Sequence, residues 1–181
     1  MPGHPHYGAL LLAASIAFTA IAMPMQAHAQ QAAAAAAAQA PAISGTTLEN
    51  KGFQLASRRG KVVLVMFWST DCAVCIDKMP ELRDNALGWA GKPFELVLVS
   101  VDARMEDVKN YNTIINQTVP LNQRLTHLWA GDAGYRDNLG LSKLPLKQLP
   151  VSLLIDKQGK LVERYNGRIP AQVWDTIADL L

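Results

Sequence analysis

Residues 61–82 read KVVLVMFWSTDCAVCIDKMPEL, and this stretch decides the fold class. It opens with Val62–Trp68, a continuous apolar run of strand length that is rich in valine, as expected for a strand covered on both faces. A short polar turn follows, and we expect a helix over residues 73–86. A buried strand that leads directly into a helix is typical of α/β proteins.

The alternation of strands and helices continues along the chain. Phe94–Val101 predicts a second buried strand, and Met105–Gln117, in which apolar residues recur at three and four positions, predicts an amphipathic helix. A short helix is expected over Asp132–Leu139, where Asp132 can cap the start and Gly140 can end it. These elements extend the α/β pattern.

The last third of the chain predicts a hairpin and a final helix. Val151–Asp156 and Lys160–Tyr165 have the composition of strands and flank the turn signal at Lys157–Gly159. Pro170 opens a helix whose apolar residues form one stripe. Nearer the N-terminus, Ile43–Ser57 predicts an additional hairpin. Together the order of elements predicts an α/β domain with a mixed central sheet.

The first 48 residues contain no Lys, Arg, Asp or Glu, although the chain has 17 basic and 15 acidic residues. Gly8–Ala22 is an apolar run of signal-peptide length, and the small residues Ala27 and Ala29 fit an A-x-A cleavage site. We therefore expect a signal peptide over residues 1–29, cleaved after Ala29. The alternative is an uncleaved anchor, because residues 8–29 have about the length, roughly 20 residues, that a bilayer requires.

Behind this leader, residues 30–42 are almost entirely Ala and Gln and predict a tether that has no amphipathic face to dock. Residues 43–181 then form one domain, which is long enough to bury a sizeable core and has an ordinary share of charged residues. The formal net charge of +2 favours neither nucleic-acid binding nor polybasic attachment to a membrane.

Cys72 and Cys75 are the only cysteines, and they lie where the first buried strand ends and its helix begins. A helix N-terminus offers unpaired N–H groups and a positive partial charge, and both stabilise a thiolate on the first cysteine. The second cysteine lies nearly one turn further on, close enough to attack a mixed disulfide on the first. This placement meets the physical requirement for thiol–disulfide exchange.

Two other uses of the cysteine pair stay open on the residues alone. A structural disulfide would suit an exported protein, but a bridge across so short a loop contributes only about 2 kcal/mol on the chain-entropy formula. A metal site is the other use. After cleavage His127 is the only histidine, so a closed Cys₂His₂ zinc site cannot be built, whereas two thiolates could hold Cu(I). Ile76 stands where attachment of c-type haem requires histidine.

The motifs around the cysteines resemble the TlpA/ResA branch of exported thioredoxin-like proteins. In that family a Gly-Lys pair and an apolar strand precede F-W-x-x-x-C-x-x-C, and M-P or F-P follows four residues on; residues 60–80 match this order. Residues 149–160, LPVSLLIDKQGK, are similar to the family's cis-proline loop and following hairpin. The resemblance covers residues 43–181 and implies a thioredoxin-like three-layer α/β/α domain with a mixed central sheet and an N-terminal β extension.

Carried over position by position, the resemblance implies that Cys72 is the nucleophile and Cys75 the resolving thiol. It makes Pro150 the cis proline that places the backbone of Leu149 beside the cysteines, where an extended substrate strand can pair with it. It also implies site-shaping roles for Trp68, Asp71 and Pro80. An ordinary core role for Trp68 and a trans turn at Pro150 are the alternatives.

The chain departs from the family at positions that set the charge around the thiols. Asp71 stands where many relatives have Trp, and a carboxylate there would oppose thiolate formation at Cys72 if the two side chains are close. Met66 and Lys78 occupy the positions of two carboxylates that handle protons in relatives. Asp71 or Asp77 is expected either to substitute for them or to be a solvated acid near the helix N-terminus.

One functional expectation and two alternatives follow. We expect an exported, periplasmic thiol–disulfide oxidoreductase that reduces protein disulfides through Cys72 and Cys75, with no cofactor beyond this redox-active pair. The resemblance implies a membrane electron donor, and apocytochrome c or a copper-centre assembly protein as substrate. A copper-binding or assembly module of the same fold is one alternative. A peroxiredoxin-like antioxidant protein is the other, although the Pro-x-x-x-Thr-x-x-Cys pattern it requires is absent around Cys72.

Overall fold

Two sheets are formed by the residues that the computed structural model describes, which are 1–3, 39–131 and 149–181. The chain divides into Met1–Ala36 and Ala37–Leu181, and the second unit holds every helix and strand described. In chain order these are β1 (Ser44–Thr46), β2 (Gly52–Gln54), the 3₁₀ helix η1 (Leu55–Arg58), β3 (Val62–Trp68), α2 (Ala73–Gly88), β4 (Phe94–Ser100), α3 (Met105–Thr118), the 3₁₀ helix η2 (Leu121–Gln123), β5 (Thr126–Trp129), β6 (Val151–Ile155), β7 (Leu161–Asn166) and α5 (Val173–Leu180). The predicted signal peptide beyond residue 3, the predicted linker up to residue 38 and the predicted helix at Asp132–Leu139 lie outside the described residues.

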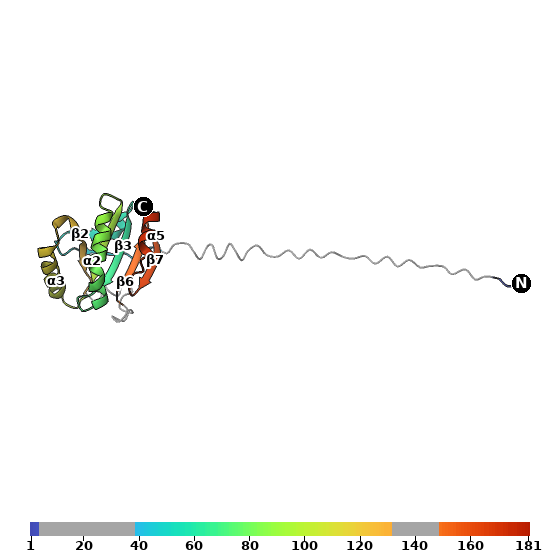
Figure 1. Ribbon diagram of the computed structural model, residues 1–181, viewed down its shortest axis with the longest axis horizontal. Helices are drawn as coiled ribbons and strands as arrows, with labels where there is room; N and C mark the ends of the chain where they lie inside the picture. Colours follow the sequence, from blue (N-terminus) through green and yellow to red (C-terminus); the bar gives the residue numbers. More distant parts are fainter. Residues whose placement is uncertain (4–38, 132–148) are drawn as a thin grey trace. The chain divides into compact units, whose positions relative to one another are not determined.

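The central sheet has the strand order β5-β4-β3-β6-β7 (Figure 1). β3 pairs in parallel with β4, where Trp68 lies opposite Ser100, and antiparallel with β6, where Phe67 lies opposite Val151. Parallel and antiparallel pairs in one sheet confirm the predicted α/β domain with a mixed central sheet. All side chains of β3 are buried because this strand lies in the middle of the sheet, which explains its continuous apolar sequence.

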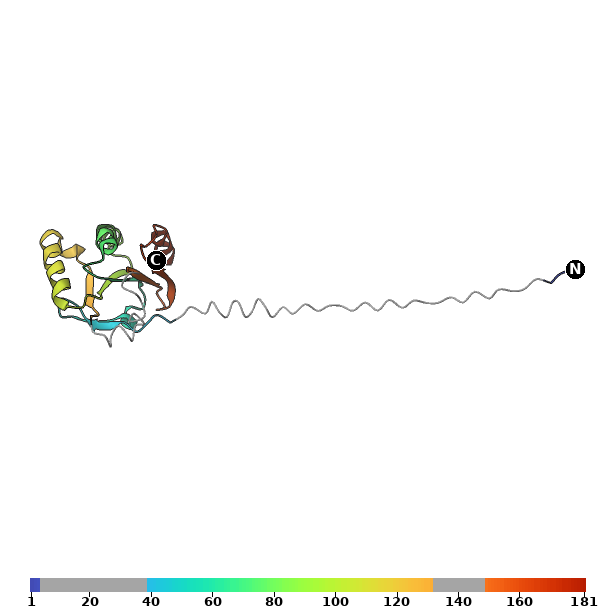
Figure 2. The same ribbon diagram turned by 90° about the horizontal axis from the view of Figure 1, so that it is seen from below.

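The side chains of β3 alternate between two cores, one on each face of the sheet. Figure 2 shows α2, α3 and α5 together on one side of the sheet and the β1–β2 hairpin on the other. The helix-side core contains Trp68 from β3 together with Cys75 from α2 and Ile177 from α5. The hairpin-side core contains Phe67 from β3 together with Phe53 from β2. The first turn of α2, which carries Cys75, is therefore packed into the helix-side core.

Most predicted elements agree with the structure to within two residues at each end, and the predicted N-terminal hairpin is present as β1 and β2. The final helix begins at Val173 rather than Pro170 because residues 171 and 172 form a turn. β5 was not predicted, since it is a four-residue edge strand without a long apolar run. Gln39 bridges to Lys160, and the Ala40 N–H donates to the Gly159 carbonyl at 3.4 Å, so contacts with the domain begin before residue 43.

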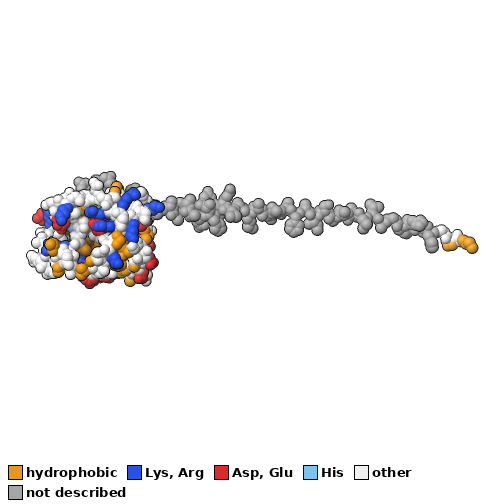
Figure 3. Space-filling view, turned by 90° about the horizontal axis from the view of Figure 1, so that it is seen from above, with side chains coloured by type: hydrophobic (Ala, Val, Ile, Leu, Met, Phe, Trp, Pro, Cys, Tyr) orange, Lys and Arg blue, Asp and Glu red, His pale blue; other side chains and the backbone are white. Residues whose placement is uncertain are grey.

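The surface shows no dominant charge in the view of Figure 3. Basic, acidic and apolar side chains are interspersed on the visible face. Within residues 1–3, 39–131 and 149–181, no helix is both long enough and apolar enough to cross a bilayer.

Candidate active site

Cys72 and Cys75 are joined by a disulfide, with their Cα atoms 5.2 Å apart. Cys72 is the N-cap residue of α2, and Cys75 lies in the first turn of that helix. The Cys75 N–H donates to the Cys72 carbonyl at 2.9 Å and also to the Cys72 Sγ at 3.2 Å, so a backbone donor of this helix end is shared with the sulfur. In the reduced protein the same donor and the helix dipole favour a thiolate at Cys72.

The two cysteines differ in burial. Cys75 is fully buried in the helix-side core, whereas Cys72 is only partly buried. An incoming sulfur atom can therefore reach Cys72, but it cannot reach Cys75 unless the core opens. This difference suits attack on an external disulfide by Cys72, followed by attack of Cys75 on Cys72 from within the protein.

The loop before β6 approaches the same end of the sheet. The Leu149–Pro150 peptide bond is cis, so the trans turn considered as an alternative is not formed. Because Phe67 lies opposite Val151 in the β3–β6 register, Pro150 is brought beside the end of β3 from which the cysteine turn departs. Leu149 is partly buried and packs against the helix-side core, as both cysteines do. Strand pairing thus gathers the two predicted motifs at one edge of the sheet.

Sequence reasoning missed a buried carboxylate that contacts the turn carrying Cys72. Asp102 lies two residues after β4 and is 7% exposed. Its Oδ1 atom accepts hydrogen bonds from the N–H and the hydroxyl of Thr70, at 2.9 and 2.7 Å. Its Oδ2 atom accepts a hydrogen bond from the Ser100 hydroxyl at 2.5 Å. Asp102 therefore ties the end of β4 to the turn between β3 and α2.

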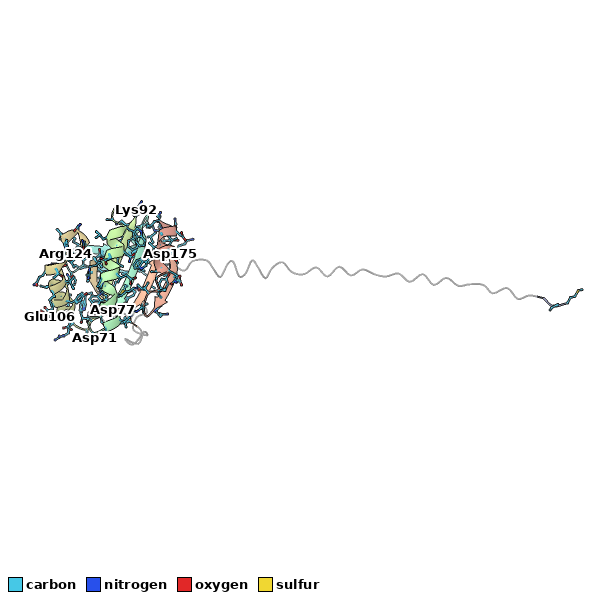
Figure 4. The ribbon with its side chains drawn as sticks, viewed as in Figure 1. Asp71, Asp77, Lys92, Glu106, Arg124 and Asp175 are labelled. Carbon is cyan, nitrogen blue, oxygen red and sulfur yellow. A yellow bond between two sulfur atoms is a disulfide. The ribbon has the colours of Figure 1, made fainter. Side chains whose placement is uncertain are left out.

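The three residues predicted to shape the site lie in different environments. Trp68 is fully buried and packs edge-on against His127 with ring centroids 6.0 Å apart, which is an ordinary core role. Asp71 is exposed and accepts a hydrogen bond from the Ser69 hydroxyl. Figure 4 shows Asp71 at the cysteine end of α2. Pro80 is exposed inside α2, on the helix that carries the pair but away from the core.

Lys78, at a position where the resemblance implied a carboxylate, is buried on the flank of α2 that faces α5. Its ammonium pairs with the Glu81 carboxylate at 2.6 Å, and the other oxygen of Glu81 accepts a hydrogen bond from Trp174 Nε1 at 2.9 Å. The hydrogen bond from Lys78 holds the pKa of Glu81 below its ordinary value. Next to this group, Asp77 is exposed and pairs with Arg168 at 2.5 Å. The charges on this flank thus neutralise one another.

The donor set for a metal ion is sparse. Burial lowers the pKa of His127 to about 4, with a smaller contribution from the positive charge of Arg83, so the imidazole is neutral at physiological pH. Among the residues with described positions, no three His, Cys, Asp or Glu side chains are grouped so that they could share a metal ion. The two thiols by themselves leave the copper-binding alternative open.

A mixed sheet whose central strand leads into a helix that begins at a cysteine pair, with a cis proline immediately before the adjacent strand, defines the thioredoxin-like class of thiol–disulfide oxidoreductases. The chain belongs to the AhpC/TSA family, whose model matches residues 36–176. It is 30% identical over 129 residues to a thiol-disulfide oxidoreductase ResA of Bacillus cereus, and the match covers 71% of this chain and 68% of that protein. These findings confirm the resemblance to ResA-like oxidoreductases.

Solved structures give the same fold. The thioredoxin domain of a thiol-disulfide oxidoreductase from Bacteroides vulgatus is similar with a TM-score of 0.65 and 26% identity, covering 79% of this chain and 95% of that one. A structure described as a thiol:disulfide interchange protein DsbE from Chlorobium tepidum has a TM-score of 0.63 and 23% identity, covering 80% of this chain and 93% of that one, and shows the fold alone. The expected thioredoxin-like fold is therefore confirmed.

Proposed function

We propose that the protein is exported and reduces the disulfides of other proteins. The thiolate of reduced Cys72 attacks one sulfur of a substrate disulfide, forms a mixed disulfide and releases the other substrate sulfur, which takes up a proton. The Cys75 thiol then loses its proton and attacks the Cys72 sulfur. The substrate leaves as a dithiol and the enzyme holds the Cys72–Cys75 disulfide. Two electrons have passed from enzyme to substrate.

The difference in burial between the two cysteines is the observation that carries this proposal. A partly exposed Cys72 at a helix N-cap can form the mixed disulfide, and a fully buried Cys75 is protected from reacting with a second substrate. A purely structural bridge needs neither the partial exposure of one cysteine residue nor the hydrogen bond that its sulfur accepts at the helix N-terminus. The small stabilisation available from so short a loop, about 2 kcal/mol, supports the same interpretation.

The proposed compartment is the periplasm, because the charge-free leader over residues 1–29 has the features of an export signal. A cysteine pair that is kept reduced in an oxidising compartment requires electrons from elsewhere, and a membrane-bound donor is the proposed source. From the resemblance to TlpA/ResA proteins, the proposed pathway is cytochrome c maturation, with apocytochrome c as substrate. A copper-centre assembly protein is the second proposed substrate.

Insulin reduction tests the chemistry. Reduced wild-type protein should accelerate precipitation of the insulin B chain, and Cys72→Ser should abolish the acceleration because the attacking sulfur is lost. Cys75→Ser is the matched control, since it removes one sulfur from the same turn but keeps the nucleophile. It should accumulate a mixed disulfide that dithiothreitol releases. Equal inactivity of the wild type and Cys72→Ser at several ambient potentials would contradict the proposal.

The direction of electron flow is tested by the reduction potential of the pair. Equilibration with glutathione buffers, followed by alkylation and mass measurement, gives the fraction of protein in each state. A potential near that of thioredoxin, about −270 mV, supports a reductase. A potential near that of DsbA, about −120 mV, would instead make the protein an oxidant and overturn the proposed direction.

Export and the copper alternative are tested separately. The protein isolated from the native host should begin at Gln30, and a chain that still begins at Met1 would replace cleavage by the uncleaved anchor. Anaerobic titration of the reduced protein with Cu(I), in competition with a strong chelator, should show weak binding. Tight binding of one Cu(I) per chain, combined with inactivity towards insulin, would favour the copper module.

A further inference from the structure

The turn between β3 and α2 is held from outside by a side chain of another strand. This turn, Ser69–Cys72, has one internal backbone hydrogen bond, from the Cys72 N–H to the Ser69 carbonyl at 3.2 Å. Its middle residue Thr70 instead gives both its N–H and its hydroxyl to Asp102, at 2.9 and 2.7 Å. The position of the turn, and with it the start of α2, therefore depends on Asp102.

Asp102 is itself fixed at both its side chain and its backbone. The Ser100 hydroxyl donates to Oδ2 at 2.5 Å, and the Asp102 N–H donates back to the Ser100 hydroxyl at 3.2 Å. On the opposite side, the indole N–H of Trp129 donates to the Asp102 carbonyl at 2.8 Å. The groups that donate to Asp102 are all neutral and come from β4, β5 and the cysteine turn. These hydrogen bonds therefore fix the position of the turn and do not supply a counter-charge.

The Trp129 ring packs closely against the backbone at Gly131. A Cβ atom built on Gly131 would lie 2.2 Å from the Trp129 ring and 2.4 Å from the Asp102 carbonyl oxygen. Only glycine lets the chain pass this close to the indole. Close packing of Gly131 on Trp129, and hydrogen bonds from Trp129 and Thr70 to Asp102, thus form a continuous set of contacts that ends two residues before Cys72.

We infer that Asp102 is a positioning residue for thiol–disulfide exchange at Cys72, and that Trp129 acts through Asp102. The inference rests on exchange at the Cys72–Cys75 pair, but not on any particular substrate or direction. A turn held in place keeps the two sulfurs at a high effective concentration for each other, which favours the disulfide over the dithiol. A loosened turn favours the dithiol and slows the attack of Cys75 on a mixed disulfide.

Equilibration of the purified protein with glutathione measures this effect. In that reaction the dithiol gives two electrons and two protons to glutathione disulfide, which leaves as two glutathione molecules. Asp102→Ala should lower the equilibrium constant for forming the protein disulfide about tenfold, which corresponds to a potential about 30 mV higher. Asp102→Asn, which keeps an oxygen acceptor for Thr70, and Thr70→Val, which keeps the N–H and the carboxylate, should each lower it about threefold.

Asp156→Ala is the matched control. Its Oδ1 accepts two backbone N–H bonds, from Gln158 and Lys160 at 2.9 and 2.8 Å, but it lies beyond β6 at the end of the sheet away from the cysteines. It should lower stability and leave the glutathione equilibrium unchanged. Trp129→Phe removes the indole N–H together with part of the ring system but keeps an aromatic side chain, and it should shift the equilibrium in the same direction as Thr70→Val.

Two results would overturn the inference. If Asp102→Asn shifts the equilibrium as far as Asp102→Ala while Thr70→Val has no effect, Asp102 acts by its charge and not by position. If none of the variants shifts the equilibrium while their unfolding midpoints fall, the role is structural only. Should Asp102→Ala fail to fold, Thr70→Val and Trp129→Phe decide alone. Neither result depends on insulin reduction, so failure of the proposed reductase function would be distinguishable.

Discussion

Two carboxylates near the active-site helix are held in opposite ways. Asp102, on the β4 side, is buried and its side chain accepts hydrogen bonds from the neutral groups of Thr70 and Ser100. Glu81, on the α5 flank, is half-exposed and pairs with the buried ammonium of Lys78. Neutral donors fix where a carboxylate lies but leave its charge uncompensated, whereas a counter-charge removes the net charge from the surroundings of the thiols. Asp102 therefore fixes the position of its neighbours, whereas Glu81 balances the charge of Lys78.

The largest effect on stability is expected at Asp102. Asp102→Ala leaves the part-buried Thr70 N–H and the buried Ser100 O–H without acceptors, and each unpaired donor costs about 1 to 3 kcal/mol. We expect the free energy of unfolding of the oxidised protein to fall by about 3 to 4 kcal/mol in urea titrations. Asp156→Ala, at an exposed turn, should lower it by about 1 kcal/mol. Equal losses for the two variants would show that the Asp102 network is no stronger than a surface turn.

The buried strands were predictable because burial on both faces leaves a signature in the sequence itself. β3 is a continuous apolar run and β4 contains the apolar run Leu96–Val99, and the polar residues that follow β3 mark the turn and the helix start. β5 has no such signature, since this strand of four residues forms through its pairing with β4 and the bridge from Leu128 to Thr47. The cysteine site was predictable for the same local reason: a strand end and a helix start are adjacent in the chain.

Asp102 and Lys78 were not predictable from local pattern. An Asp two residues after a strand and a Lys inside a helix are both ordinary solvated residues by sequence. Asp102 is buried because the parallel register places the end of β4 beside the end of β3, where the cysteine turn begins. Lys78 is buried on the flank of α2 where Trp174 of α5 donates a hydrogen bond to Glu81. One signal was available for Asp102, because the carboxyl ends of adjacent parallel strands gather functional side chains in α/β sheets.

His127 is a third buried ionisable group, and its charged form would be buried beside another positive charge. His127 is buried beside Trp68, Tyr111 borders the same small space, and the nearby Arg83 is also positive. Its pKa in the folded protein is about 4, below the ordinary value of 6.5. As the pH falls, the unfolded chain binds this proton first. Stability is therefore lost between about pH 6.5 and pH 4, by at most about 3 kcal/mol.

Urea titrations across this pH range check the effect of His127. His127→Gln keeps a polar side chain of similar reach but cannot take up a proton, so its stability should change less than that of the wild type between pH 6.5 and pH 4. At pH 8, where His127 is neutral, the difference in free energy of unfolding between the variant and the wild type measures the loss of packing alone. Parallel curves for the two proteins over the whole range would mean that His127 is not the group that responds to acid.

The smallest effect is expected on the α5 flank, and its size depends on which partner is removed. Glu81→Gln leaves the buried Lys78 ammonium without a counter-charge and should lower the free energy of unfolding by about 1 to 2 kcal/mol at pH 7. Lys78→Met leaves a half-exposed carboxylate that water can solvate, and its loss should be below about 1 kcal/mol. Because Lys78 lowers the pKa of Glu81, the contribution of the pair is present above the ordinary pKa of 4.5 and is lost as the pH falls through the folded value. The free energies of unfolding of the wild type and Glu81→Gln should therefore converge on acidification. If Lys78→Met loses more stability than Glu81→Gln, this flank contributes packing of the lysine stem and not charge balance.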